Sequence, residues 1–274
     1  MKAKERLLIE PQPMTEQDPA ERVGNVNEVP LGYTLDQAKR EAQRCIQCKR
    51  PKCIDGCPVR VNIPEFIKAL EDGDVKNAIR IIKQTNLLPA VCGRVCPQED
   101  QCQVVCTVAK SRKDLAKSVQ IGKLERFAAD WEREQGEIEM PEVAAKTGKR
   151  AAIVGAGPAG LTVAGDLVKR GHDVTVFEAF HKPGGVLTYG IPEFRLPKEI
   201  VFQEGETLGR LGVEFKYNHV IGKTISVEEL QEEFDSIFVG TGAGLPRFMN
   251  IPGESFPGVY SANEYLTRAN LRRA

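Results

Sequence analysis

The sequence predicts an α+β protein of two domains, in which an N-terminal all-α domain precedes an α/β, Rossmann-like half-domain. All eight cysteines lie between Cys45 and Cys106, in loops that separate short stretches of helical periodicity. After a polar linker that ends near Gly148, the pattern changes to a strand, a glycine-rich turn, a helix and a second strand. This change of rhythm within 274 residues is typical of two joined domains.

The composition is that of a folded, soluble protein. The chain is 41% hydrophobic and 28% charged, and its 38 Lys and Arg residues balance 38 Asp and Glu residues. This balance gives no reason to expect a nucleic acid or a membrane as partner. No apolar run approaches the ~20 residues that span a bilayer, and the first residues lack the apolar segment of a secretion signal. We therefore expect a reducing, cytoplasmic location.

The helical part is predicted from its start and stop signals. Residues 1–33 have little periodicity, and we interpret them as an extended arm that can lie over another domain. Residues 34–140 should form the helical domain. Its first helix follows a Thr34 N-cap, a second runs from Pro64 to Gly73, and a third follows an Asp74 N-cap.

A fourth helix is expected over about 119–134, where apolar residues recur at helical spacing. The apolar core of the helical domain looks thin, so bound metal is expected to supply part of its order. Residues 148–274 should form the Rossmann-like part. Its expected elements are strands at 150–157 and 172–178, a helix at 158–170, and a later buried strand within 234–244.

The cysteines fall into two quartets, which point to bound metal in a reducing compartment. The first quartet is Cys45, Cys48, Cys53 and Cys57, and the second is Cys92, Cys96, Cys102 and Cys106. Structural zinc uses repeated C-x2-C pairs, but only one such pair is present. A fourth cysteine followed by proline, as in Cys57-Pro58, is a ferredoxin arrangement in which that thiol serves the other cluster. The spacing thus favours iron–sulfur over zinc, with inert buried thiols as a third interpretation.

Basic residues crowd the first quartet, against only Glu41 and Asp55 in the same stretch. They are Lys39, Arg40, Arg44, Lys49, Arg50, Lys52 and Arg60. We expect them to offset the negative charge of the clusters and thereby raise the cluster potentials. A docking patch for an acidic electron-transfer partner and a simple solvated face remain alternatives.

A dinucleotide fingerprint follows the first predicted strand. It consists of Gly155, Gly157, Pro158, Ala159 and Gly160. The first glycine permits a tight turn, the second lets the backbone approach a pyrophosphate, and the third packs helix on strand. Glu178 ends the next strand, where a carboxylate accepts the hydroxyls of an adenosine ribose. The alternative for Glu178 is a surface acid at a strand end.

Two later glycine-containing segments indicate FAD rather than NAD as the dinucleotide. Gly184-Gly185 follows Glu178 after five residues, and Thr241-Gly242 follows the strand predicted within 234–244. Glycine pairs let backbone approach a ligand closely. Ordinary turn chemistry is the alternative for each pair taken alone.

Taken together, these runs resemble the small-subunit family of NADPH-dependent glutamate synthase. The large subunit of electron-bifurcating ferredoxin–NADP oxidoreductase and the N-terminal part of dihydropyrimidine dehydrogenase share this architecture. The matching runs cover nearly the whole chain and are PMTEQDPAER, CIQCKRPKCIDGCPV, AVCGRVCPQEDQC, IGKLERFAAD, VGAGPAGL and GIPEFRLPK.

The resemblance implies two 4Fe-4S clusters that share ligands between the quartets. One cluster would be held by Cys45, Cys48, Cys53 and Cys106, and the other by Cys57, Cys96, Cys102 and Glu125. Cys92 would then be a bystander, although spacing alone favours it as the eighth ligand. The resemblance further implies FAD contacts at Gly184, Gly185, Val186 and Arg195.

The implied function is an oxidoreductase subunit that relays electrons between NAD(P)H, FAD and two clusters, without a catalytic acid, base or nucleophile from the protein. Its partner would be a second redox subunit, either the glutamate synthase large subunit or a ferredoxin-reductase-type subunit. Members of the family continue into a second glycine fingerprint for NADPH, which these residues lack. The alternatives are a non-catalytic electron-transfer or assembly module, and a zinc-stabilised nucleotide-binding protein.

Overall fold

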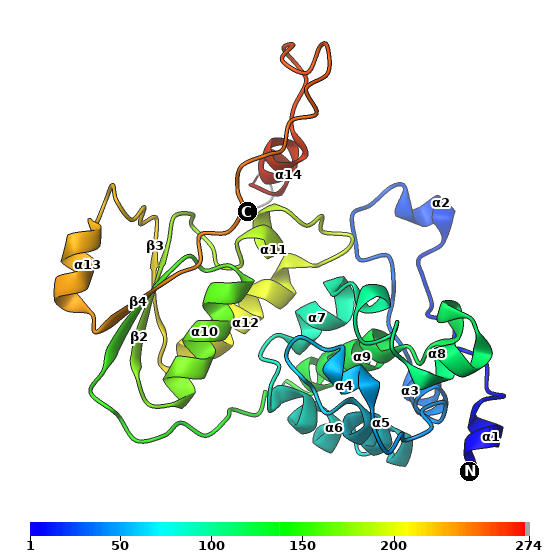
Figure 1. Cartoon of the computed structure of the whole chain (residues 1–274). Helices are drawn as coiled ribbons and strands as arrows, with labels where there is room; N and C mark the ends of the chain where they lie inside the picture. The colour runs from blue at the N-terminus through cyan, green and yellow to red at the C-terminus, as the bar shows by residue number, and fades with distance from the viewer. Residues whose placement is uncertain (137, 272–274) are drawn as a thin grey trace. The chain divides into compact units, whose positions relative to one another are not determined.

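The computed structural model describes residues 1–136 and 138–271, which form two compact units, Met1–Ile138 and Glu139–Ala274 (Figure 1). The expected helical range 34–140 includes residue 137, and the expected range 148–274 includes residues 272–274. These four positions lie outside the described residues. Each unit is considered by itself.

The first unit is helical, as predicted. Its α-helices are α1 (Ala3–Arg6), α2 (Pro19–Arg22), α3 (Leu35–Ala42), α4 (Lys52–Asp55), α5 (Ile63–Asp72), α6 (Val75–Lys83), α7 (Pro89–Val95), α8 (Thr107–Arg112) and α9 (Ile121–Glu134). The expected start signals are confirmed: the side chain of Thr34 accepts from the backbone N–H of Gln37, and Asp74 accepts from that of Asn77 at 3.1 Å. Gly73 ends α5 in the left-handed region, at a φ of 86°.

The apolar core of this unit is more extensive than we expected from the helices alone. Fully buried side chains at its centre are Phe66, Ile67, Leu70, Ile79, Ile82 and Leu124. Residues between the helices also contribute, among them Val61, Leu88 and Val119. Because loops as well as helix faces supply apolar surface, counting helical stripes underestimated the core.

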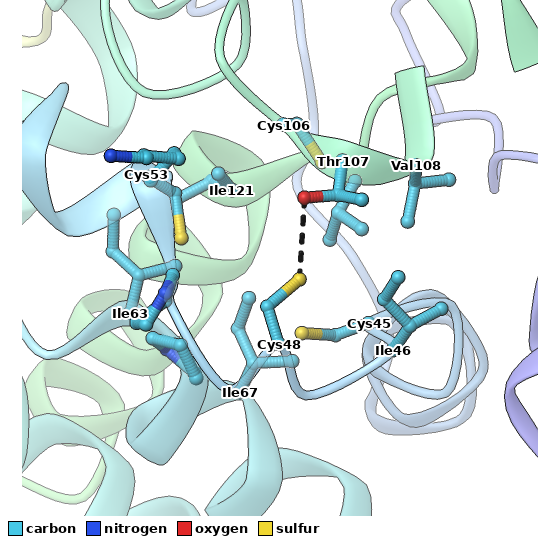
Figure 2. A pocket seen from close by; sticks show the side chains of 14 residues that line it. Cys45, Ile46, Cys48, Cys53, Ile63, Ile67, Cys106, Thr107, Val108 and Ile121 are labelled. Atoms are coloured by element: carbon cyan, nitrogen blue, oxygen red, sulfur yellow. Dashed lines mark hydrogen bonds between the residues drawn. The ribbon is translucent and has the colours of Figure 1, made fainter. Parts of the chain in front are cut away.

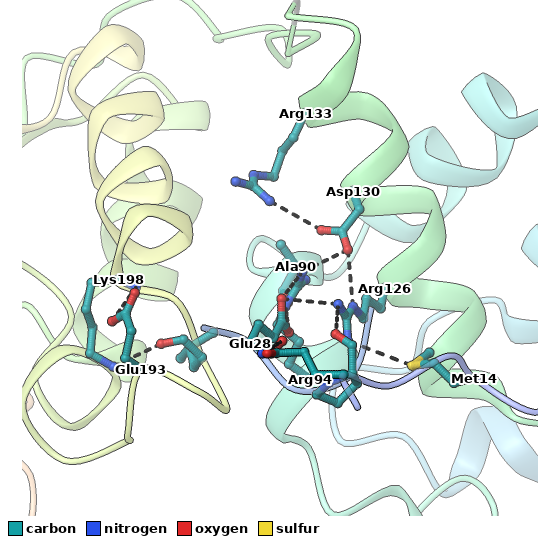
Figure 3. A network of polar contacts seen from close by, with 12 residues as sticks. Met14, Glu28, Ala90, Arg94, Arg126, Asp130, Arg133, Glu193 and Lys198 are labelled. Atoms are coloured by element: carbon teal, nitrogen blue, oxygen red, sulfur yellow. Dashed lines mark hydrogen bonds and ion pairs between the residues drawn. The ribbon is translucent and has the colours of Figure 1, made fainter. Parts of the chain in front are cut away.

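The arm at residues 1–33 packs against the helices of its own unit through charged groups. Arg6 pairs with Glu71 at 2.7 Å, and Glu28 pairs with Arg94 on α7 at 2.7 Å. Arg126 on α9 donates to the backbone carbonyl of Pro30 at 2.8 Å and pairs with Glu28, as part of the network in Figure 3. The arm thus joins α5, α7 and α9, which surround the cysteine-bearing loops.

The second unit contains a parallel sheet. Its strands are β1 (Arg150–Val154), β2 (Asp173–Glu178), β3 (Glu214–Tyr217) and β4 (Ser236–Val239), in the order β3-β2-β1-β4. Its helices are α10 (Pro158–Lys169), α11 (Val186–Tyr189), α12 (Lys198–Leu211), α13 (Val227–Glu233) and α14 (Ala262–Leu271). Parallel pairing of β1 with β2 through the crossover helix α10 is the Rossmann-type connection that we predicted.

Two apolar clusters cover opposite faces of the sheet. Ile153 and Val176 pack with α10 and Leu208 of α12, whereas Val154 and Phe177 pack with Leu230 of α13. The expectation of a buried strand within 234–244 was wrong in one respect. β4 lies at a sheet edge and pairs with β1 alone among the described residues, so it is half-exposed, and Val239 is 68% exposed.

Helices α7 and α9 approach each other closely at Gly93. A Cβ added at this glycine would lie 2.6 Å from the backbone nitrogen of Arg126 on α9. Such a distance is too short for any side chain, so glycine is required for this packing. The close approach brings the end of α7, which carries cysteines, to the face of α9.

We therefore expect Gly93→Ala to destabilise the helical unit by about 1–3 kcal/mol, because the backbones of α7 and α9 must separate. Gly209→Ala is a matched control, since this glycine of α12 has no atom within 4 Å of its added Cβ. The control should gain up to about 1 kcal/mol from helix propensity. Urea unfolding followed by circular dichroism measures both, and equal stability of the two variants would contradict the required close packing.

Candidate cofactor sites

Four cysteines from separate segments line one cavity of the helical unit (Figure 2). Cys45 and Cys48 lie in the loop after α3, Cys53 lies on α4, and Cys106 is the residue before α8. These are the four thiols that the family resemblance assigned to one cluster. The structure brings them together across more than 50 residues of sequence, and all eight cysteines of the chain are free thiols.

The rest of the cavity wall is mainly aliphatic. It includes Ile46, Ile63, Ile67, Val108, Val119 and Ile121. Burial in this wall, with a smaller contribution from the neighbouring thiols, raises the pKa of Cys45 to about 11 and that of Cys53 to about 12. A group of thiolates is therefore costly here unless a bound cation offsets the charge.

Polar groups also reach the sulfurs of this cavity. The hydroxyl of Thr107 lies 3.3 Å from Cys48 Sγ (Figure 2). The side-chain amide of Gln47 lies 3.6 Å from Cys45 Sγ. Arg6 of the arm donates to the backbone carbonyl of Cys45 at 3.0 Å. Sequence reasoning did not single out Gln47, Thr107 or Arg6, because only the fold places them beside the thiols.

The basic residues near the first quartet do not act as one group. Arg44 is fully buried and pairs with Glu41 at 2.5 Å. Lys52 and Arg60 are exposed, and both lie near Asp55, at 3.7 and 3.4 Å. The expectation that all seven offset cluster charge was therefore wrong for Arg44, whose charge is balanced by its own carboxylate.

Arg44 instead holds backbone segments together. Its guanidinium donates to the carbonyls of Ile9 in the arm and of Lys117 and Ser118 before α9. Glu41 accepts in turn from the backbone N–H of Gln12 and of Gln120. The buried pair fixes the loop that begins at Cys45 relative to the start of α9.

The remaining expected ligands also lie close to one another. Cys57 follows α4, Cys96 ends α7, Cys102 follows a 3-10 turn, and Glu125 lies on α9. Burial, together with the charges of Glu125 and Cys57, raises the pKa of Cys102 to about 12. Burial is likewise the main cause that raises the pKa of Glu125 to about 8. A hydrogen bond from Asn86 lowers this pKa, and the charge of Cys96 raises it.

Cys92 lies in the same group. Its neighbour Cys96, together with burial and the charge of Glu125, raises the pKa of Cys92. The proximity of Cys92 in turn lowers the pKa of Cys96 to about 7. Both candidates for the eighth ligand, Cys92 and Glu125, are therefore neighbours of Cys96. Among the described residues, no three Cys, His, Asp or Glu side chains are arranged for a single metal ion.

The glycine fingerprint forms a tight turn between β1 and α10. Gly155 has a φ of 103°, and a Cβ on it would lie 2.5 Å from the carbonyl oxygen of Gly240. Gly157 is the N-cap of α10, with Pro158 and then Ala159 as its first residues. A Cβ on Gly160 would lie 1.9 Å from the carbonyl oxygen of Gly155, which confirms its role in packing helix on strand.

Glu178 is buried at the end of β2, only 5% exposed, so it is not a surface acid. Its two carboxylate oxygens accept from the backbone N–H groups of Ala156, at 2.7 Å, and Phe180, at 2.9 Å. Each oxygen keeps a second lone pair for another donor. The carboxylate thus lies directly behind the glycine turn.

The later glycine pairs reach the same turn. The backbone N–H of Gly184 donates to Ala156 at 2.7 Å, and a Cβ on Gly185 would lie 3.0 Å from Cα of Gly157. Thr241 lies 3.5 Å from the Cβ position of Gly155. Three glycine-containing segments therefore meet at the carboxyl ends of β1, β2 and β4, where ligands of such sheets bind.

Three further expected FAD contacts are open to solvent. Val186, the first residue of α11, and Arg195 are exposed, and Gly242 has no atom within 4 Å of its Cβ position. Arg195 belongs to a loop that Lys198 closes by donating to the carbonyls of two of its residues, Ile191 and Leu196. Partial burial lowers the pKa of Lys198 to about 8.

Comparison with known proteins identifies both units. Residues 22–137 match the family model described as dihydropyrimidine dehydrogenase domain II, 4Fe-4S cluster, and residues 149–273 match the pyridine nucleotide-disulphide oxidoreductase model. The glutamate synthase (NADPH) small chain of Escherichia coli (strain K12) is 38% identical over 234 residues, which are 85% of this chain and 49% of that relative. The chain is thus similar to glutamate synthase (NADPH) small chains over most of its own length.

Two further relatives are similar to the same part of the chain. The glutamate synthase (NADPH) small chain of Bacillus subtilis (strain 168) is 38% identical over 263 residues, 93% of this chain and 52% of the relative. The NAD-dependent dihydropyrimidine dehydrogenase subunit PreT of Escherichia coli (strain K12) is 37% identical over 227 residues, 81% of this chain and 54% of the relative. The chain thus spans about half the length of these relatives. No helix in the described part of the chain is both long and apolar enough to cross a membrane.

The buried pair beside Cys45 gives a prediction. Arg44→Met should lose about 3–5 kcal/mol of stability, because it leaves the carboxylate of Glu41 buried without its cation. Lys52→Met removes an exposed partner of Asp55 and should change stability by less than about 0.5 kcal/mol. Thermal unfolding of both variants, followed by circular dichroism, tests this. A similar midpoint for the two would contradict the structural role of Arg44.

Proposed function

We propose that these residues form the iron–sulfur and flavin part of an NADPH-dependent oxidoreductase of the glutamate synthase small-chain type. The observation that carries the proposal is the convergence of Cys45, Cys48, Cys53 and Cys106 on one cavity with aliphatic walls. Thiolates from several loops around a space larger than one ion fit an iron–sulfur cluster. The family and both domain matches support the same class of protein.

A second 4Fe-4S cluster would be held by Cys57, Cys96, Cys102 and Glu125. Charge interactions of Cys102 with Glu125 and Cys57, and of Glu125 with Cys96, support this assignment. A carboxylate is a harder ligand than a thiolate, so this cluster should differ in potential from the first.

FAD would be held at the carboxyl ends of the strands. Backbone N–H groups of the turn at Gly155 and Gly157 would donate to the pyrophosphate at the start of α10, Gly160 would keep the helix close to the strand, and Glu178 would accept hydrogen bonds from the ribose hydroxyls. Gly184 and Gly185 leave backbone, rather than bulky side chains, along the same turn, and the backbone of Thr241 lies beside it. When bound, FAD supplies two-electron exchange with a nicotinamide, and the clusters supply single-electron transfer to a partner.

The partner would be a second redox subunit of the glutamate synthase large-subunit type, and a ferredoxin-reductase-type subunit is the alternative. Residues 1–274 contain a single glycine fingerprint, so we assign no NADPH site to them. The nucleotide would bind to a second domain of the kind that the family resemblance implies.

Metal analysis of anaerobically purified or reconstituted protein tests the cluster assignment. We expect about eight irons and eight sulfides per chain and a broad visible absorbance. Cys102→Ala should lose about half of this iron, because it removes a thiolate ligand from one cluster. Its matched control, Cys92→Ala, removes a neighbouring thiol and should keep all the iron.

Two results would end the assignment. A colourless protein that contains zinc would favour structural zinc at the thiols. Loss of iron from Cys92→Ala but not from Glu125→Ala would instead show that Cys92 is the eighth ligand.

The enzyme and the non-catalytic module differ in their response to NADPH. NADPH should bleach the visible absorbance of bound FAD when a polypeptide with the second nucleotide-binding domain is present, and should leave residues 1–274 alone unchanged. Spectra recorded anaerobically measure this. Bleaching by residues 1–274 alone would show an NADPH site that we have not assigned, and no bleaching in either mixture would favour the module.

A further inference from the structure

Asn86 is a buried amide that touches both candidates for the eighth cluster ligand. It lies between α6 and α7 and is 5% exposed. Its amino group donates to Oε1 of Glu125 at 2.7 Å, and its carbonyl oxygen lies 3.6 Å from Sγ of Cys92. We propose that Asn86 is the positioning residue that commits Glu125, and not Cys92, to the second iron–sulfur cluster.

The orientation of the Asn86 amide is fixed by the backbone. The N–H of Leu88 donates to Oδ1 of Asn86 at 3.0 Å, so this end of the amide must be the oxygen. The amino group is thereby turned to Glu125, whose Oε1 accepts its hydrogen bond. A flipped amide would set its amino group against the Leu88 N–H.

The hydrogen bond to Glu125 engages one carboxylate oxygen and restricts the rotation of a buried side chain. The second oxygen is left for another partner. Cys96 raises the pKa of Glu125, and Glu125 raises the pKa of Cys102, as expected for neighbouring groups. Amide donors of this kind commonly hold a ligating side chain in the orientation that its metal requires. Asn86 therefore favours Glu125 as a ligand.

The carbonyl oxygen of the Asn86 amide holds Cys92 away from the cluster. Because the amide oxygen only accepts, the Cys92 thiol must donate to it. Turning this sulfur toward iron would cost the hydrogen bond and leave Asn86 with one fewer partner. The same side chain thus holds one candidate in place and the other away.

This inference rests on the proposed function, since it concerns a ligand of the second cluster. A purely structural Asn86, which only satisfies the Leu88 N–H, is the competing interpretation. The two interpretations differ in one result. Only if Asn86 positions Glu125 does the iron content of Asn86→Leu depend on the presence of Cys92. Iron and sulfide analysis, with electron paramagnetic resonance of the reduced protein to count clusters, provides readouts that do not depend on enzyme activity.

Three variants of the reconstituted chain test the choice of ligand. Cys92→Ala alone should keep all the iron. Asn86→Leu releases both candidates and should also keep it, because the freed Cys92 replaces Glu125, with a changed resonance spectrum from the second cluster. The double variant, Asn86→Leu with Cys92→Ala, should lose about half the iron and one of the two cluster signals.

Full iron in the double variant would overturn the proposal, because Glu125 would then need no help from Asn86. Half the iron in Asn86→Leu alone would also overturn it, since Cys92 would be unable to take over. Absence of iron from the unchanged chain would instead overturn the proposed function, so the two failures are distinguishable.

Asn86→Asp provides a second variant in case Asn86→Leu does not fold. It keeps the oxygen that accepts from Leu88 and Cys92 but replaces the amino donor to Glu125 with an acceptor. Cys92 therefore stays held while Glu125 loses its donor, and about half the iron should be lost. Full iron in this variant, with circular dichroism showing an intact fold, would contradict the positioning role.

Discussion

The helical unit depends on one constraint, which is that thiols from several loops are buried together among aliphatic side chains. Ionised thiols are unfavourable in such surroundings, and the burial of Cys45 and Cys53 raises the pKa of each accordingly. A bound iron–sulfur cluster reverses this cost, because its iron ions stabilise the thiolate form. The buried thiols of this cavity therefore become favourable thiolates only when a cluster binds them.

The rest of the unit fixes the loops that carry these thiols. The buried pair of Arg44 and Glu41 ties the start of the Cys45 loop to the arm and to the segment before α9. Gly93 lets α7 lie against α9, so that Cys96 and Glu125 become neighbours. Short helices alone would give little rigidity, and these long-range contacts supply it.

The sequence predicted the features that local chemistry decides. Thr34 and Asp74 were identified as helix caps, and Gly155 and Gly160 as members of a tight β–α turn, because each role follows from a few neighbouring residues. The four thiols of the first cavity were grouped through the family resemblance, since spacing alone cannot join Cys106 to a quartet more than 50 residues away.

The features that were missed depend on contacts between distant segments. Asn86 resembles any loop asparagine until the fold places it between Cys92 and Glu125. Arg44 was read as a charge near the cluster, because its partner Glu41 and three backbone carbonyls surround it only in the folded chain. β3, of four residues, was too short to stand out from its surroundings, and β4 was expected to be buried because strand patterning does not reveal which strand lies at an edge.

Iron anomalous diffraction from crystals of the anaerobically purified protein tests the central claim most directly. The account predicts a compact group of iron peaks within bonding distance of the sulfurs of Cys45, Cys48, Cys53 and Cys106. No iron between these sulfurs, or a single zinc bound by them, would contradict it.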